Sequence, residues 1–117
     1  MNWNTLNNSK QINKIVELSH IKPQIIFKHS RTCPISAISM SRLESGSSAL
    51  EDADIYYLDL LSYRSVSNDV ASMLGVHHES PQVIVLSDGE VSYDESHLDI
   101  SVTDILDHFN YLKNGDK

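Results

Sequence analysis

Cysteine is almost absent from this sequence: the chain has 117 residues and one cysteine, Cys33. A single cysteine cannot form a disulfide within the chain, and it cannot build a metal site from several thiolates. Any redox chemistry at this position must therefore involve a second molecule that supplies the other sulfur. Glycine is also scarce, with four residues, and none of them lies in a glycine-rich loop of the kind that cradles phosphates.

Long apolar runs and excess positive charge are missing as well. No apolar run approaches the roughly 20 residues that cross a bilayer, and polar residues interrupt the first 20 positions, so no signal peptide is expected. Nine Lys and Arg residues against sixteen Asp and Glu residues give a net charge of −7, which disfavours nucleic acids and anionic membranes as partners. We expect a single domain over residues 1–117, located in the cytoplasm.

Apolar periodicity and capping residues indicate four helices and four strands. The helices are expected at about residues 9–20, 34–45, 67–74 and from 101 onward. The strands are expected at residues 24–28, 54–60, 82–86 and 91–93. Ser9, Ser67 and Ser101 are the expected capping residues, and Asp88-Gly89 favours a tight turn between the last two strands.

The order of these elements is α-β-α-β-α-β-β-α. Two βα units imply parallel strands, and the hairpin at Asp88-Gly89 implies an antiparallel pair. The order matches a thioredoxin-like fold of the α/β class. We therefore expect a four-stranded mixed sheet, with two parallel strands and an antiparallel hairpin, flanked by helices.

Cys33 is expected at the start of a helix, because Pro34 directly after it suits the first helical position. Unpaired backbone N–H groups and the helix dipole at that place favour the thiolate form of the sulfur. Lys28, His29 and Arg31 add positive charge nearby. The same residues also fit a second interpretation, in which a small buried cysteine lies beside a solvated loop.

Two further residues bear on disulfide chemistry. Thioredoxin-like oxidoreductases usually carry a second cysteine three positions after the first, whereas this chain has Ser36 there, which cannot form a disulfide. Ser36 also fits a structural role, with its hydroxyl satisfying an N–H at the helix end. Ser80-Pro81 opens a predicted strand where thioredoxin-like proteins carry a cis proline, which would aim the Ser80 backbone at a disulfide partner.

A metal site is not expected from the histidines. They are scattered, with no spacing typical of metal ligands, and the acidic residues form no evident catalytic pair. The six are His20, His29, His77, His78, His97 and His108.

Residues 27–36 read FKHSRTCPIS and strongly resemble the signature of the YtxJ-like monothiol bacilliredoxins. Residues 64–68, 78–83, 88–91 and 96–97 resemble the same family, so that the resemblance covers the chain from about residue 9 to the last predicted helix. Leu98 departs from it, since the family often has an aromatic residue at that place.

The resemblance implies a thioredoxin-like enzyme that removes bacillithiol, a low-molecular-weight thiol, from mixed disulfides on client proteins. Cys33 would be the nucleophile, and bacillithiol or a redox partner would resolve the resulting Cys33–bacillithiol disulfide. Bacillithiol would act as a co-substrate, with no permanently bound cofactor and no metal. The residues expected to bind substrate or support Cys33 are Lys28, His29, Arg31, Thr32, Pro34, Ser36, Ser80 and Pro81.

Two other functions remain open from the sequence. A monothiol thioredoxin-like domain could use Cys33 together with a thiol cofactor to carry an iron–sulfur cluster, as monothiol glutaredoxins do. Alternatively, the chain could be a stress-related interaction domain with an unreactive cysteine.

Overall fold

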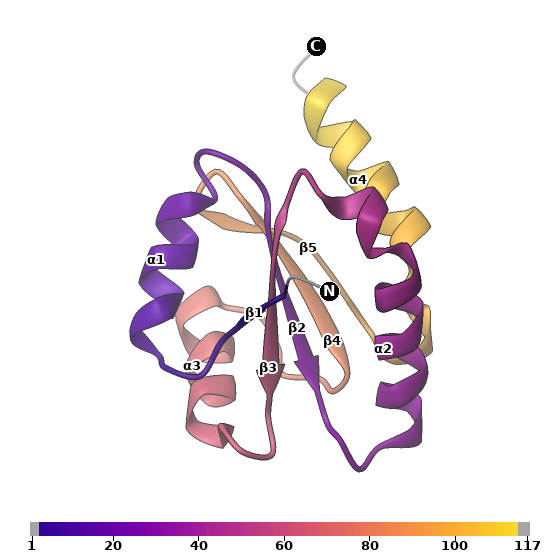
Figure 1. Ribbon diagram of the computed structural model, residues 1–117. Coiled ribbons are helices and arrows are strands. Elements are labelled where there is room, and N and C mark those ends of the chain that lie inside the picture. Colours follow the sequence, from indigo (N-terminus) through magenta and orange to yellow (C-terminus); the bar gives the residue numbers. More distant parts are fainter. Residues whose placement is uncertain (1–2, 115–117) are drawn as a thin grey trace.

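Five strands form one mixed sheet in the computed structural model, which describes residues 3–114 (Figure 1). The strands lie in the order β1-β3-β2-β4-β5 across the sheet. No helix in this described part of the chain is long and apolar enough to cross a membrane. In chain order the elements are β1 (Asn4–Thr5), α1 (Lys10–Leu18), β2 (Gln24–His29), α2 (Pro34–Gly46), the short 3-10 turn η1 (Ser47–Leu50), β3 (Asp54–Asp59), α3 (Arg64–Leu74), β4 (Gln82–Ser87), β5 (Glu90–Ser96), the short 3-10 turn η2 (His97–Asp99) and α4 (Val102–Asn114).

The central strand β2 is parallel to β3 on one side and antiparallel to β4 on the other. The β4–β5 hairpin turns at Asp88 and Gly89, whose φ angles of 52° and 85° give the left-handed backbone that a tight hairpin turn requires. The predicted α/β class, the parallel pair and the antiparallel hairpin are therefore confirmed.

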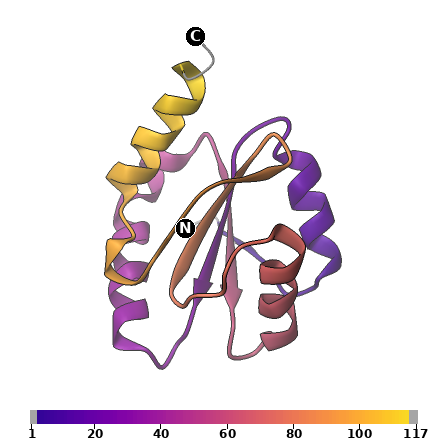
Figure 2. The same cartoon turned by 180° about the vertical axis from the view of Figure 1, so that it is seen from behind.

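Helices cover both faces of the sheet, with α1 and α3 on one face and α2 and α4 on the other (Figures 1 and 2). Successive side chains of β2 alternate between these layers. Ile26 belongs to the core on the α1/α3 face, whereas Phe27 belongs to the core on the α2/α4 face. By the same alternation, Lys28 faces the α1/α3 layer and His29 faces the α2/α4 layer.

The prediction of four strands was wrong, because β1 adds a fifth at the edge of the sheet. Its two residues pair in parallel with Tyr56 and Tyr57 of β3, and the N–H of Leu6 donates to the Tyr57 carbonyl at 2.8 Å. Asn4 and Thr5 are exposed and polar, so they show none of the apolar alternation by which a strand is recognised. Backbone pairing with β3 makes this strand, together with a hydrogen bond from the Asn4 side-chain amide to the Ile55 carbonyl at 3.4 Å.

The predicted start of α3 at Ser67 was also wrong, since the helix begins at Arg64. Ser67 lies inside the helix and is fully buried, and its hydroxyl has no hydrogen-bond partner in the part of the chain that the structure describes. The residue before the helix, Tyr63, makes no side-chain capping bond, so the true start carries no capping signal. In contrast, the Ser101 hydroxyl accepts the Asp104 N–H at 3.3 Å, as expected for a helix start.

One edge of the sheet collects the segments that matter for the site. The parallel strands β2 and β3 both end there, and the antiparallel partner β4 begins there, with Lys28 opposite Gln82. β5 also ends at this edge, because Ser96 pairs with Gln82. The loops at residues 30–33, 60–63 and 77–81 therefore lie toward the lower edge of the molecule in Figure 1, and residues 97–99 continue from the end of β5 to pack beside α2.

Candidate active site

Cys33 is the N-cap residue of α2, as predicted, with an extended backbone (φ −101°, ψ 118°) and Pro34 directly after it. Its N–H donates to the Ser30 carbonyl and its carbonyl accepts the Ala37 N–H, both at 3.1 Å. The thiol is free and half-buried. The sulfur therefore stands at the positive end of a 13-residue helix, where a negative charge is stabilised and where another molecule can reach it.

Ser36 fixes the loop that carries Cys33. It is fully buried, its hydroxyl oxygen accepts the Ser30 N–H at 3.0 Å, and the same oxygen lies 2.6 Å from His29 Nδ1. The N–H that the hydroxyl satisfies thus belongs to the loop before the helix rather than to the helix end. Through this contact the end of β2 is joined to the first turn of α2, which holds the intervening loop in one conformation.

His29 is itself held by aromatic rings. Its ring centroid lies 5.7 Å from that of Phe27 and 5.6 Å from that of Tyr57, and Trp3 packs edge-on against Phe27 at 6.0 Å. Burial lowers the pKa of His29, with smaller opposing effects from charged neighbours such as Asp59, so its neutral form is favoured. Sequence reasoning missed Trp3 and Tyr57, which are distant from His29 in the chain.

Arg31 is the exposed cation of the Cys33 loop. Its Nε lies 2.8 Å from an Asp59 carboxylate oxygen and its Nη2 donates to the Ser62 hydroxyl at 3.3 Å, while more than half of its side chain remains exposed. Burial acts to raise the pKa of Asp59, but hydrogen bonds from Ser62 and Arg31 outweigh it and lower that pKa. Arg31 therefore links the Cys33 loop to the loop after β3.

Lys28 does not reach the surface. Its side chain is fully buried, and its Nζ lies 3.1 Å from Nδ1 of His78 in the loop after α3. Burial lowers the pKa of Lys28 to about 8. Of the three basic residues predicted around Cys33, two are thus buried beneath the site, and only Arg31 presents its charge to solvent.

The Ser80–Pro81 peptide bond is cis. Pro81 is buried, and its carbonyl accepts the His97 N–H at 3.0 Å. The Ser80 hydroxyl is buried and has no hydrogen-bond partner among residues 3–114. Because β4 begins beside the end of β2, this bond lies at the same edge of the sheet as Cys33. Thr32 and Pro34, the other predicted supporting residues, are both exposed next to Cys33.

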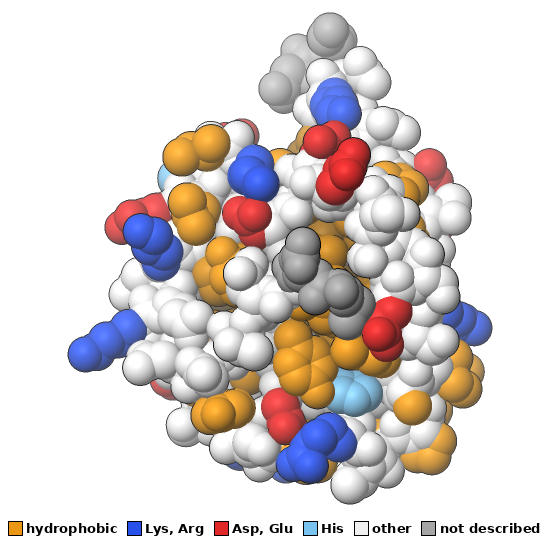
Figure 3. Space-filling model, viewed as in Figure 1, with side chains coloured by type: hydrophobic (Ala, Val, Ile, Leu, Met, Phe, Trp, Pro, Cys, Tyr) orange, Lys and Arg blue, Asp and Glu red, His pale blue; other side chains and the backbone are white. Residues whose placement is uncertain are grey.

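Exposed apolar side chains also gather at this edge. Ile35 and Ile38 lie on the first two turns of α2, where Figure 3 shows hydrophobic side chains along the outer side of the helix. Leu61 and Tyr63 follow β3, and Leu98 lies in η2. The Leu98 carbonyl accepts a hydrogen bond from Arg42 of α2 at 2.8 Å. These five residues, called here the apolar rim, give the surface near Cys33 the character of a protein-contact site.

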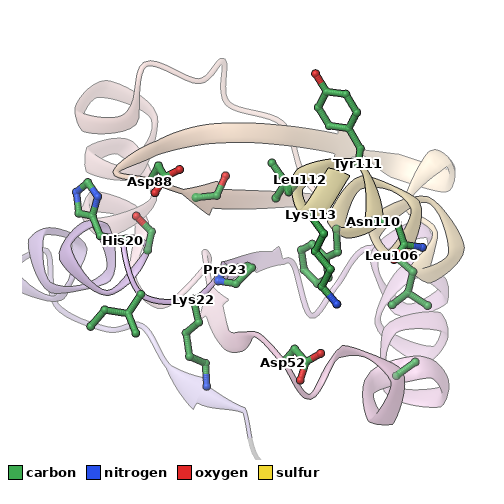
Figure 4. Close-up of a pocket in the computed structure, with 15 residues that line it drawn as sticks. His20, Lys22, Pro23, Asp52, Asp88, Leu106, Asn110, Tyr111, Leu112 and Lys113 are labelled. Atoms are coloured by element: carbon green, nitrogen blue, oxygen red, sulfur yellow. The ribbon is translucent and has the colours of Figure 1, made fainter. Parts of the chain in front are cut away.

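A cavity of about 360 Å³ lies at the other end of the sheet (Figure 4). His20 and Asp88 border it on one side, and the last turns of α4 border it on the other. None of the residues predicted to bind substrate or support Cys33 lines it. Within residues 3–114, no three His, Cys, Asp or Glu side chains converge as a metal site would require.

Comparison with known proteins agrees with this geometry. The sequence model of a family described as monothiol bacilliredoxin BrxC matches residues 4–105. A solved structure, described as a candidate oxidoreductase with a thioredoxin fold, is 31% identical, with 91% of this chain and 92% of that chain covered and a TM-score of 0.79.

More distant structures share the fold alone. Oxidised thioredoxin O2 from Arabidopsis thaliana is 13% identical, with 94% of this chain and 93% of that chain covered and a TM-score of 0.71. Mitochondrial thioredoxin 3 from Saccharomyces cerevisiae is 14% identical, with 92% and 93% covered and the same TM-score of 0.71. The predicted thioredoxin-like fold is thereby confirmed.

Proposed function

We propose that this chain, a member of the monothiol bacilliredoxin family, removes bacillithiol from mixed disulfides on client proteins. Its family and its thioredoxin fold both support a thiol–disulfide redox role. The observation that carries the proposal is the position of Cys33. The cysteine stands alone at the start of α2, at the same sheet edge as the cis Pro81, with Ser36 where a resolving cysteine would be.

The reaction is a single thiol–disulfide exchange followed by regeneration. The Cys33 thiolate attacks the bacillithiol sulfur of the mixed disulfide, a bond forms between these two sulfurs, and the bond to the client sulfur breaks. The client leaves as a thiolate and takes up a proton from solvent. A second thiol, from bacillithiol or a redox partner, then attacks the adduct and releases Cys33. One disulfide thus replaces another: the client sulfur becomes a thiol again, and bacillithiol leaves in a disulfide with the second thiol.

The residues around Cys33 have distinct parts in this proposal. Ser36 cannot form a disulfide and holds the loop through His29 and the Ser30 N–H. The Ser80 backbone pairs with an extended segment of the client, and the apolar rim contacts the client surface. Arg31, the exposed cation, attracts the carboxylates of bacillithiol.

The test is the intact mass of the reduced protein after incubation with a bacillithiol mixed disulfide of a small model protein. We expect one bacillithiol mass on the wild type, an equal amount of client thiol released, and no adduct on Cys33→Ser. The serine variant keeps the size of the side chain but lacks the nucleophile, so it separates exchange at Cys33 from adsorption. Absence of any adduct on the wild type, with the substrate intact, would overturn the proposal.

A further inference from the structure

Lys28 places a charged side chain in the buried interior of the protein. It is fully buried in β2, and its register partners Leu58 and Gln82 are fully buried too. Burial of an ammonium group is unfavourable unless acceptors surround it, and an apolar side chain of the same length would fill this space without that penalty. Packing therefore does not account for the lysine.

The only hydrogen bond that the Lys28 side chain makes in the described part of the chain is to His78. Because a lysine ammonium only donates, Nδ1 of His78 accepts this bond at 3.1 Å and the ring is neutral, with its proton on Nε2. Burial first, and then the charge of Lys28, lower the pKa of His78 and favour that neutral form. The charges of Arg64 and His77 lower the pKa of His78 further, and the charge of Glu79 raises it.

His78 belongs to the loop that leads into the cis Pro81. Gln82 holds the same loop on both sides of His78. Its Nε2 donates to the His77 carbonyl at 2.9 Å, and its Oε1 accepts the Glu79 N–H at 3.4 Å. Lys28 and Gln82 are register partners on neighbouring strands, so they point to the same face of the sheet. Together they hold three consecutive residues, and the next one along the chain is Ser80.

We propose that Lys28 and His78 are positioning residues, whose hydrogen bond holds the loop at residues 77–80 and so sets where the Ser80 backbone meets a client protein beside Cys33. This inference rests on the proposed function, because the client is the bacillithiolated protein. A small disulfide has no extended chain to pair with Ser80. The pair therefore affects exchange with protein clients and leaves exchange with small disulfides unchanged.

Two amide variants of His78 test the contact at the level of one atom. His78→Asn places an amide oxygen where Nδ1 lies, whereas His78→Gln carries its amide farther out, toward the place of Nε2. Both variants keep Lys28 and add no charge, so each is the matched control of the other. The rates to compare are bacillithiol transfer to Cys33 from a protein mixed disulfide and from bacillithiol disulfide.

We expect His78→Gln to slow transfer from the protein about tenfold, through a higher half-saturating client concentration, which corresponds to a modest loss of binding free energy. His78→Asn should stay near the wild type, and neither variant should change the rate with bacillithiol disulfide. Equal rates for the two variants with the protein client would overturn the inference. An equal loss with both disulfides would also overturn it, because it would place the effect on Cys33 itself.

Amide hydrogen exchange at residues 77–80 provides a readout that does not depend on the proposed function. We expect faster exchange in His78→Gln than in His78→Asn or the wild type. If the wild type transfers no bacillithiol at all, the proposed function fails, and this measurement still decides whether the pair positions the loop. Unchanged exchange at these residues in both variants would overturn the positioning role.

Discussion

His29 and Lys28 are neighbours at the end of β2, yet they face opposite layers of the molecule and meet different partners. His29 points toward α2 and contacts the Ser36 hydroxyl, which anchors the Cys33 loop. Lys28 points toward the α1/α3 layer and binds His78, in the loop before Pro81. Because side chains alternate along a strand, two consecutive residues anchor two loops of the same sheet edge from opposite sides.

The two contacts differ in their effect on stability. The His29–Ser36 contact joins a hydroxyl to an imidazole whose neutral form burial favours. The Ser36 hydroxyl also accepts the Ser30 N–H. The Lys28–His78 contact holds an ammonium group away from water, which burial disfavours. We therefore expect loss of the Ser36 hydroxyl to destabilise the fold and replacement of Lys28 by an apolar side chain to stabilise it, while both changes impair exchange with client proteins.

The largest expected change follows Ser36→Ala. The substitution leaves the Ser30 N–H and His29 Nδ1 without the hydroxyl, and we expect a loss of about 1–3 kcal/mol in the free energy of unfolding. Ser41→Ala, on the exposed side of the same helix, is the control and should change stability by no more than about 0.5 kcal/mol. Urea unfolding of both variants measures the difference. Equal midpoints would contradict the anchoring role of Ser36.

Lys28→Met should change stability in the opposite direction. Methionine fills the buried space with an apolar chain of similar length, and we expect a gain of about 1 kcal/mol in the free energy of unfolding, measured in the same urea series. Transfer of bacillithiol from a protein client should nevertheless slow, because the loop at residues 77–80 loses its anchor. A variant that is both less stable and fully active would refute the contrast between the two sides of β2.

The pH dependence of stability separates the two sides further. Burial lowers the pKa values of His29 and His78 below 6.5, so the folded protein binds fewer protons than the unfolded chain in that range, and stability falls as the pH drops through 6.5. The pKa of Lys28 is lowered from 10.5 to about 8, so stability rises as the pH increases between those values. Unfolding free energies across both ranges should show both trends. Lys28→Met should lose the alkaline trend and weaken the acidic one, because the Lys28 charge also lowers the pKa of His78.

Local sequence patterns predicted the framework of the site. Cys33-Pro34 marks the start of α2, and Ser80-Pro81 marks the start of β4, because proline restricts the backbone at and around its own position. The contacts that support these residues could not be predicted in this way. Lys28 and His78 are 50 residues apart, and Arg31 and Asp59 are 28 apart, so only the folded chain brings them together.

The elements that the sequence did not reveal have a common cause. β1 is recruited through backbone hydrogen bonds to β3, and α3 begins at a residue without a capping side chain. The pattern of polar and apolar residues therefore indicates neither β1 nor the start of α3. The burial of Lys28, which the sequence predicts only as positive charge near Cys33, could not be foreseen either, since a charged residue within an apolar strand does not show which face it occupies.

The smallest expected effect on stability belongs to Arg31→Ala. Its contact with Asp59 is well formed at 2.8 Å, but the side chain is 57% exposed, so water and salt screen the ion pair. We expect a loss of at most about 1 kcal/mol, against Lys14→Ala on the exposed side of α1 as the control. Exchange is the more informative measurement. If Arg31 attracts bacillithiol carboxylates, Arg31→Ala slows transfer from bacillithiol disulfide at low salt. Added salt then reduces the difference in rate between the variant and the wild type. Lys28→Met removes a buried charge and should show no such salt dependence. An Arg31→Ala rate equal to that of the wild type at low salt would show that Arg31 does not bind substrate.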